Sequence, residues 1–174
     1  MEYIKLGRTG IDVSRLCFGA LVIGPLQVNL PVARGADVIL RGLELGINFI
    51  DTAEIYGTYA HIREAIRRWG KKPVIATKCY AYTKEGAEKS LEKARKELDL
   101  DVIDIFLLHE QESRLTLKGH KEALDYFINQ KEKGIIRAVG ASTHNIEVVE
   151  ACAEMPEIDV IHPIVNISGL GIGD

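Results

Sequence analysis

Polar residues able to carry acid–base chemistry lie at or just after the ends of short apolar runs in the sequence. Asp51 ends the run NFID, Lys78 follows VIAT, and His109 follows IDIFLL. Ser142 follows IIRAVGA, and Tyr56 lies in the segment after Asp51. In parallel βα folds, loops and helix N-termini converge at the carboxyl ends of the strands. We therefore expect these side chains to meet at one end of a sheet.

Three of these residues together suit general acid catalysis. Burying the ammonium of Lys78 beside apolar residues is unfavourable unless an anion pairs with it, and Asp51 is the natural candidate. A lysine held in this way near a phenol favours the phenolate, so we predict that the pKa of Tyr56 falls below its usual value of about 10. Taken singly, each residue has a simpler interpretation: Asp51 as a helix cap, Lys78 as an ion-pair partner, Tyr56 as a rim aromatic and His109 as a core histidine.

The elements that must position these residues alternate along the chain. Short β-branched runs alternate with stretches whose apolar residues recur at helical spacing, which is typical of βα units around a parallel sheet. Short alternating runs on either side of GRTG predict a β-hairpin at the N-terminus. The predicted strands cover residues 15–20, 48–53, 74–79, 102–109, 135–142 and 160–167, and helical patterns lie near 32–45, 62–69, 91–98, 121–133 and 146–153.

Six βα repeats without a reversal favour a closed barrel over a doubly wound sheet. A complete (β/α)₈ barrel needs eight units and about 250 residues, whereas this chain has 174 residues. The expected fold class is therefore α/β, a TIM barrel that is incomplete here, with about six βα units plus the hairpin. No linker divides the chain, so we predict a single partial domain over residues 1–174.

Composition excludes several classes of function. The chain has 22 Lys and Arg against 25 Asp and Glu, a net charge of −3, which argues against binding nucleic acid or anionic lipid. No run approaches the roughly 20 apolar residues of a membrane span, and the opening residues lack the apolar core of a signal peptide. We therefore expect a cytoplasmic protein. The three cysteines are spaced for neither a disulfide framework nor a metal site, so no metal is expected.

Five stretches of the sequence resemble, in order, the signatures of the aldo-keto reductase superfamily: LGRTGIDVSRLCFGA, NFIDTAEIYG, VIATK, VIDIFLLH and GIIRAVGAS. The resemblance implies a (β/α)₈ barrel closed at the bottom by the hairpin, and the reduction of an aldehyde or ketone by NADPH, less often NADH. It places the family's catalytic tetrad at Asp51, Tyr56, Lys78 and His109. Tyr56 would donate a proton to the carbonyl oxygen, Lys78 oriented by Asp51 would tune it, and His109 would hydrogen-bond the same oxygen.

The resemblance also implies cofactor contacts. These would come from the backbone at Gly19 and Ala20, from Asp51, and from the side chain of Ser142. The family's usual Asn and Gln for the nicotinamide carboxamide are replaced by Thr143 and His162, whose hydroxyl and imidazole can still form hydrogen bonds, although His162 could instead be a simple surface or core histidine. The ending GLGIGD resembles a prokaryotic branch whose members often carry a C-terminal iron–sulfur region, but no cluster ligands occur here.

The family's seventh and eighth strands, which bind the pyrophosphate and the 2′-phosphate, have no counterpart in this sequence. We therefore predict the N-terminal portion of a longer reductase, truncated and impaired in cofactor binding, whose open sheet edges could promote self-association. Its partner would be a small-molecule carbonyl substrate. Two alternatives stay open: a non-catalytic cofactor-binding or regulatory subunit, and a lyase or isomerase in which Lys78 forms a Schiff base.

Overall fold

A computed structural model describes residues 1–167 of the chain. Its main sheet has six parallel strands in sequence order, β3 to β8, and curls as half of a barrel. A separate antiparallel hairpin pairs β1 with β2. The strands are β1 (Tyr3–Lys5), β2 (Asp12–Ser14), β3 (Phe18–Gly19), β4 (Phe49–Asp51), β5 (Val74–Cys79), β6 (Ile103–Leu108), β7 (Ile136–Thr143) and β8 (Val160–Pro163).

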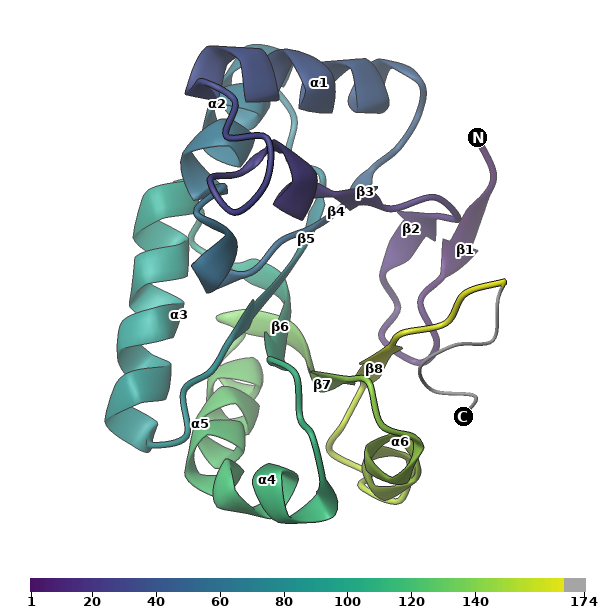
Figure 1. Cartoon of the computed structure of the whole chain (residues 1–174), viewed down its shortest axis with the longest axis vertical. Helices are drawn as coiled ribbons and strands as arrows, with labels where there is room; N and C mark the ends of the chain where they lie inside the picture. The colour runs from purple at the N-terminus through teal and green to yellow at the C-terminus, as the bar shows by residue number, and fades with distance from the viewer. Residues whose placement is uncertain (168–174) are drawn as a thin grey trace.

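Helices connect successive strands and cover the sheet. Figure 1 shows α2, α3 and α5 along one side of the strands and the hairpin on the other. The helical elements are η1 (Ala20–Ile23), α1 (Val32–Glu44), η2 (Glu54–Tyr56), α2 (Tyr59–Trp69), α3 (Lys84–Leu98), α4 (Arg114–Gly119), α5 (Lys121–Glu132) and α6 (Ile146–Ala153). The arrangement confirms the predicted fold class, an incomplete (β/α)₈ barrel with an N-terminal hairpin.

The two edge strands are shorter than the sequence predicted. Strand β3 has two residues, because Ala20 is fully buried in the core and begins the 3₁₀ helix η1. Strand β8 ends at Pro163, whose partner Thr143 is the last residue of β7. The predicted strands over 15–20 and 160–167 are therefore too long. The sequence GLGIGD lies outside the described residues.

Helix α4 is an element that the sequence pattern did not predict. Six residues are too few to display a clear apolar repeat. Its local signal is Ser113, whose side-chain oxygen accepts a hydrogen bond from the backbone N–H of Thr116 at 3.0 Å. Asn145 caps α6 in the same way, at Glu147.

The sheet separates two apolar clusters. The larger one fills the space between the outer face of the sheet and the helices, with Phe106 of β6 packed against Phe127 of α5 at a centroid distance of 4.6 Å. The smaller cluster lies on the inner face, where the hairpin packs against the strands. Its members are Ile11, Val13, Ala76, Ile105, Leu107 and Ala138. The hairpin therefore covers part of the interior of the half-barrel.

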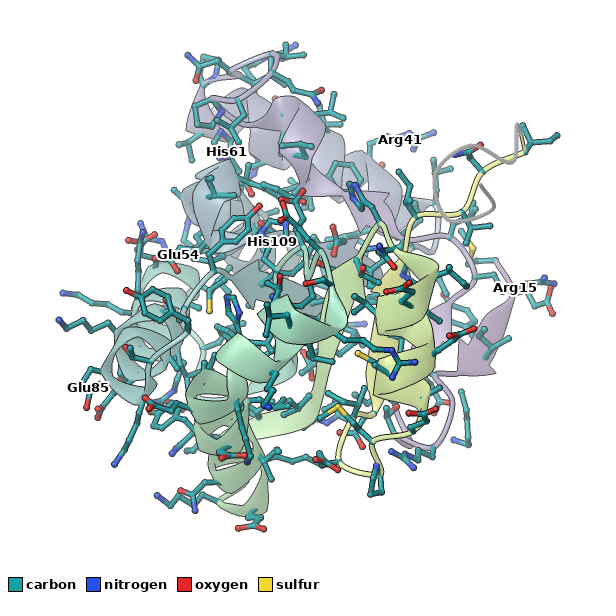
Figure 2. All side chains as sticks on the ribbon, turned by 60° about the horizontal axis from the view of Figure 1, so that its bottom comes forward. Arg15, Arg41, Glu54, His61, Glu85 and His109 are labelled. Carbon is teal, nitrogen blue, oxygen red and sulfur yellow. The ribbon has the colours of Figure 1, made fainter. Side chains whose placement is uncertain are left out.

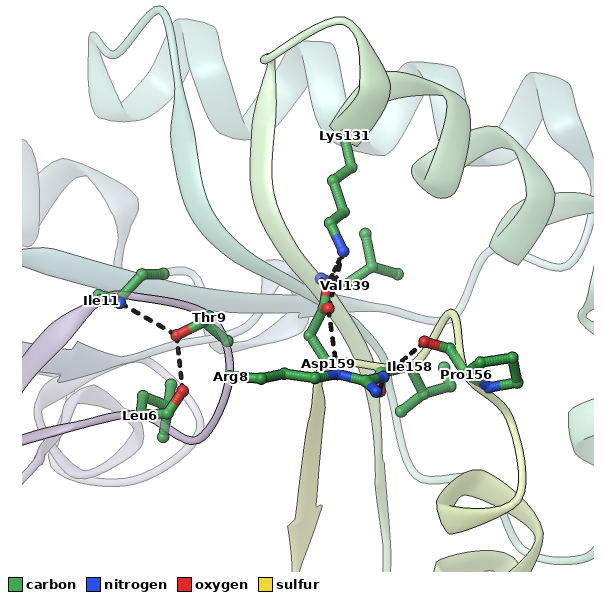
Figure 3. Close-up of polar contacts among 9 residues, drawn as sticks. All are labelled: Leu6, Arg8, Thr9, Ile11, Lys131, Val139, Pro156, Ile158 and Asp159. Carbon is green, nitrogen blue, oxygen red and sulfur yellow. Dashed lines mark hydrogen bonds and ion pairs between the residues drawn. The ribbon is translucent and has the colours of Figure 1, made fainter.

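An ionic contact fastens this hairpin to the segment before β8 (Figure 3). The guanidinium of Arg8 donates hydrogen bonds to the carbonyl oxygens of Pro156 at 2.5 Å and Ile158 at 2.6 Å. The carboxylate of Asp159 lies beside it and accepts hydrogen bonds from Lys131 Nζ at 2.5 and 2.7 Å and from the backbone N–H of Val139 at 3.0 Å. One buried carboxylate thus joins β7, α5 and the hairpin.

We expect Asp159→Asn to lower the free energy of unfolding by about 1.5–3 kcal/mol, because it removes charge-assisted hydrogen bonds from a side chain that is 8% exposed. Denaturant unfolding measures the change. The matched control is Asp12→Asn, which breaks an ion pair with Lys5 whose side chains are both about two-thirds exposed. That pair should contribute no more than about 1 kcal/mol. Equal losses in the two variants would contradict this account.

Candidate active site

Lys78 and Asp51 form a buried ion pair at the carboxyl ends of two neighbouring strands. Side chains two residues apart in a strand share a face, and Ala76 of β5 lies on the inner face, so Lys78 also points inward. Its side chain is 3% exposed, and its ammonium donates hydrogen bonds to Asp51 Oδ1 at 2.6 Å and to the carbonyl oxygen of Thr52 at 2.7 Å. The predicted pairing of Lys78 with Asp51 is present.

Tyr56 is brought over this pair by a tight turn. It ends η2, and the following Gly57 adopts φ of 65°, a left-handed conformation that glycine accepts without strain. A Cβ at Gly57 would also lie 2.9 Å from Cγ of Pro25, so the turn has no room for a side chain. The turn leaves Lys78 Nζ 5.1 Å from the centroid of the Tyr56 ring.

The predicted direction of the Tyr56 pKa is wrong in this structure. Burial raises the pKa to about 12, and the negative charges of Asp51 and Glu110 act in the same direction. The phenol therefore keeps its proton at neutral pH.

His109 lies beside Tyr56, just after β6. The ring centroids are 5.6 Å apart in an edge-to-face arrangement. His109 is 3% exposed, and Figure 2 shows it near the middle of the molecule, away from fringe side chains such as Arg15 and Glu85. Burial, followed by the positive charge of Lys78, lowers its pKa to about 4. The imidazole is therefore neutral at physiological pH.

These side chains open onto a cavity of about 310 Å³ at the carboxyl end of the sheet. Its lining is mainly polar side chains from the ends of the strands, with an apolar segment after β8. The lining residues are Tyr56, Lys78, His109, Glu110, Ser142, His144, His162, Pro163, Ile164 and Val165. Three of the four residues predicted to form the tetrad thus face one space, and the fourth, Asp51, binds Lys78.

The residues predicted to bind the cofactor lie close to this cavity. Ser142 lines it, and its hydroxyl oxygen accepts a hydrogen bond from the backbone N–H of Glu110 at 2.9 Å. His162 lines it as well, with Nδ1 3.7 Å from Asp51 Oδ1. Gly19 lines a second, more apolar cavity of about 360 Å³, to which Asp51 and His162 also belong. Ala20 is fully buried next to Gly19.

Thr143 does not offer the free hydroxyl that the sequence suggested. It is fully buried, donates a hydrogen bond to the carbonyl oxygen of Gln111 at 2.5 Å and accepts one from the backbone N–H of Asn145 at 3.0 Å. Its hydroxyl shapes the loop after β7. His162, in contrast, is half-exposed at the cavity and is not a core histidine.

Sequence reasoning missed two residues of this site, Tyr80 and Glu110. The Tyr80 ring stacks on His109 with centroids 4.5 Å apart and planes 25° apart. Its hydroxyl donates a hydrogen bond to the carboxylate of Glu110. Both residues could have been noticed from the sequence, because Tyr80 comes two residues after Lys78 and Glu110 directly follows His109. The two strands that they follow, β5 and β6, are neighbours in the sheet.

Comparison with known proteins identifies the family. Residues 15–168 match the model of the aldo/keto reductase family. The chain belongs to that family. Among its relatives, aldo-keto reductase YhdN of Bacillus subtilis is 26% identical over 96% of this chain. The "Probable voltage-gated potassium channel subunit beta" of Arabidopsis thaliana is 30% identical over 95% of it.

A solved structure of a "Putative aldo-keto reductase" from Pseudomonas aeruginosa superposes on this chain with a TM-score of 0.85. It is 26% identical, and the match covers 95% of this chain and 68% of that one. The chain spans 54% of the length of each of the two curated relatives. The superposition agrees with the incomplete (β/α)₈ barrel described above.

Two negative findings concern the described part of this aldo/keto reductase chain. Within residues 1–167, no helix is both long and apolar enough to cross a membrane. The same residues contain no cluster of three His, Cys, Asp or Glu side chains that could hold a metal ion.

Proposed function

We propose that this chain carries the catalytic tetrad of a cytoplasmic reductase that uses NADPH, or alternatively NADH, to reduce a small-molecule aldehyde or ketone. The observation that carries the proposal is the arrangement of Tyr56 between the Lys78–Asp51 pair and His109, at one polar cavity. Its three cysteines are free, which suits the reducing cytoplasm.

Tyr56 is the proposed proton donor. Its raised pKa of about 12 means that the phenol holds its proton at neutral pH. When a carbonyl is reduced, negative charge develops on its oxygen, and the resulting alkoxide is a stronger base than a phenolate. A protonated phenol in contact with that oxygen can therefore deliver its proton in the reduction direction.

Lys78 and His109 would stabilise the developing charge. The ammonium of Lys78 is fixed by two hydrogen bonds, so its charge is in place before the reaction begins. Neutral His109 carries one N–H, which is suited to donate to the same carbonyl oxygen and set its angle. The same two hydrogen bonds disfavour the Schiff-base alternative, because they engage the Lys78 nitrogen as a donor to Asp51 and Thr52 and so hold it back from attack on a carbonyl.

The residues around the cavity fit a nicotinamide head group. The hydroxyl of Ser142 and the imidazole of His162 can hydrogen-bond a carboxamide, and Asp51 lies beside them. A Cβ added at Gly19 would meet no atom within 4 Å, so the backbone there faces open space. A reduced nicotinamide, when bound, supplies the hydride for the carbonyl carbon.

We further propose that the seventh and eighth βα units are needed for tight cofactor binding. In this barrel, the loops after those strands commonly form the phosphate site. Edge strands β3 and β8 each pair on one side only within the described sheet, which supports self-association of the 174-residue form.

Fluorescence titration with NADPH tests both the reductase function and the role of the seventh and eighth βα units. A form of the gene-encoded length should bind the cofactor and oxidise it with an aldehyde panel, and the 174-residue chain should bind it more weakly. Equal affinity of the two forms would contradict the proposed role of the missing units. An absence of cofactor binding in the longer form would contradict the proposed function.

A non-catalytic regulatory subunit is the second candidate. It is favoured by the similarity to the Arabidopsis relative, the "Probable voltage-gated potassium channel subunit beta". The same titration distinguishes a reductase from a regulatory subunit, since a regulatory subunit would bind NADPH without oxidising it with any aldehyde of the panel.

A further inference from the structure

The orientation of the His109 imidazole is not fixed by a hydrogen bond at its buried nitrogen. Nδ1 has no hydrogen-bond partner among the described residues. In many catalytic sites, a partner at one ring nitrogen sets the tautomer and the direction of the other. The backbone N–H of His109 is anchored to the carbonyl oxygen of Cys79 at 2.8 Å, but that bond leaves the side chain free to turn.

Aromatic rings hold the imidazole instead. Tyr80 lies nearly parallel to it at a centroid distance of 4.5 Å, with 25° between the planes. Tyr56 meets it edge-on at 5.6 Å, with 74° between the planes. Contacts from two directions restrict both the tilt and the rotation of the ring.

The Tyr80 ring is itself held in place, although it is 42% exposed. Its hydroxyl donates a hydrogen bond to the carboxylate of Glu110. The backbone of Glu110 has φ of 45°, an uncommon conformation for a residue with a side chain. That conformation is fixed by Ser142, whose hydroxyl oxygen accepts the Glu110 N–H at 2.9 Å and whose carbonyl oxygen accepts the Gln111 N–H at 2.7 Å.

We propose that Tyr80, secured by Glu110, is a positioning residue that sets the orientation of the His109 imidazole and shields one of its faces from water. The effect on turnover rests on the proposed reductase function, whereas the effect on the imidazole does not. The contacts that hold the imidazole come from three neighbouring strands: Tyr80 follows β5, Glu110 follows β6 and Ser142 belongs to β7.

NMR titration of His109 in the wild-type chain and in Tyr80→Leu tests the proposal. The charged and titratable groups that act on this imidazole are Lys78, Glu110, Asp51 and His162. Leucine removes the stacking and admits water, so the His109 pKa should rise from about 4 toward 6.5. Tyr80→Phe keeps the ring but loses the hydrogen bond to Glu110, so its His109 pKa should lie between those of the wild type and Tyr80→Leu.

Turnover by the protein of gene-encoded length provides a second readout. A misoriented imidazole should lower kcat in Tyr80→Leu by roughly ten- to a hundredfold, with a smaller change in KM. Tyr80→Phe, which keeps the ring but lacks the hydrogen bond to Glu110, should recover part of that loss. If the wild-type protein shows no turnover while His109 shifts as expected, the reductase function fails and the positioning role stands.

The chain offers a matched control in Tyr82→Leu. Tyr82 is two residues further along and meets His120 edge-on at 6.3 Å, away from the cavity. The Tyr82→Leu substitution should leave both the His109 pKa and kcat unchanged. If Tyr80→Leu does not fold, Glu110→Ala serves instead, because it frees the Tyr80 hydroxyl and should reduce the ring-current shift of the His109 protons. An unchanged His109 spectrum in whichever variant folds overturns the proposal.

Discussion

Replacing Tyr56 with Phe in the protein of gene-encoded length should lower kcat for carbonyl reduction by about 10²- to 10⁴-fold, the usual contribution of a positioned general acid. The ring contacts to Lys78 and His109 survive the change, because only the hydroxyl is removed. Cofactor affinity should therefore stay close to that of the wild type. Steady-state kinetics with an aldehyde, together with NADPH titration, measures the two effects separately.

The control for this experiment is Tyr82→Phe. Tyr82 is 66% exposed and outside the cavity lining, so loss of its hydroxyl should not alter kcat. An unaltered kcat in Tyr56→Phe would refute the proton-donor role. A parallel loss of cofactor binding in that variant would instead mean that the hydroxyl holds the cofactor.

Gly140→Ala should separate the last strand from the sheet. A Cβ at Gly140 would lie 1.8 Å from the carbonyl oxygen of Val160, its partner in β8, and 2.9 Å from Cδ2 of Leu107. No side-chain rotation can relieve a clash with a backbone atom, so β8 must move. We expect the free energy of unfolding to fall by about 3 kcal/mol. Denaturant unfolding followed by circular dichroism checks this.

Gly119→Ala is the matched comparison. Gly119 ends α4, and a Cβ there would meet no atom within 4 Å. Its effect should be within about 0.5 kcal/mol, or slightly stabilising. An unfolding midpoint for Gly140→Ala equal to that of Gly119→Ala would show that β7 and β8 are not packed as closely as described.

The central strands were predictable because they are buried on both faces. The run VIATKC coincides with β5, and IDIFLL coincides with β6. An apolar run flanked by turn residues suffices to locate such a strand. The ends of β3 and β8 were not predictable in this way, because an edge strand extends only as far as its single neighbour pairs with it.

The convergence of the site was also predictable, because parallel strands place their carboxyl ends together. The electrostatics of Tyr56 were not. The direction of its pKa depends on burial and on the distances to Asp51 and Glu110, which no spacing in the sequence reveals. The contact of Tyr80 with His109 likewise required knowing that β5 and β6 are adjacent.

The contact between Arg8 and the segment before β8 bears on how the protein emerges from the ribosome. The residues that it joins, Arg8 and Ile158, are 150 positions apart in the sequence. At a synthesis rate of about 5–20 residues per second, the first hairpin must wait roughly 8–30 s for its counterpart to be made. Throughout translation of the intervening strands, Ile11 and Val13 would lack part of their final packing, so nascent chains should be most dependent on chaperones during that interval.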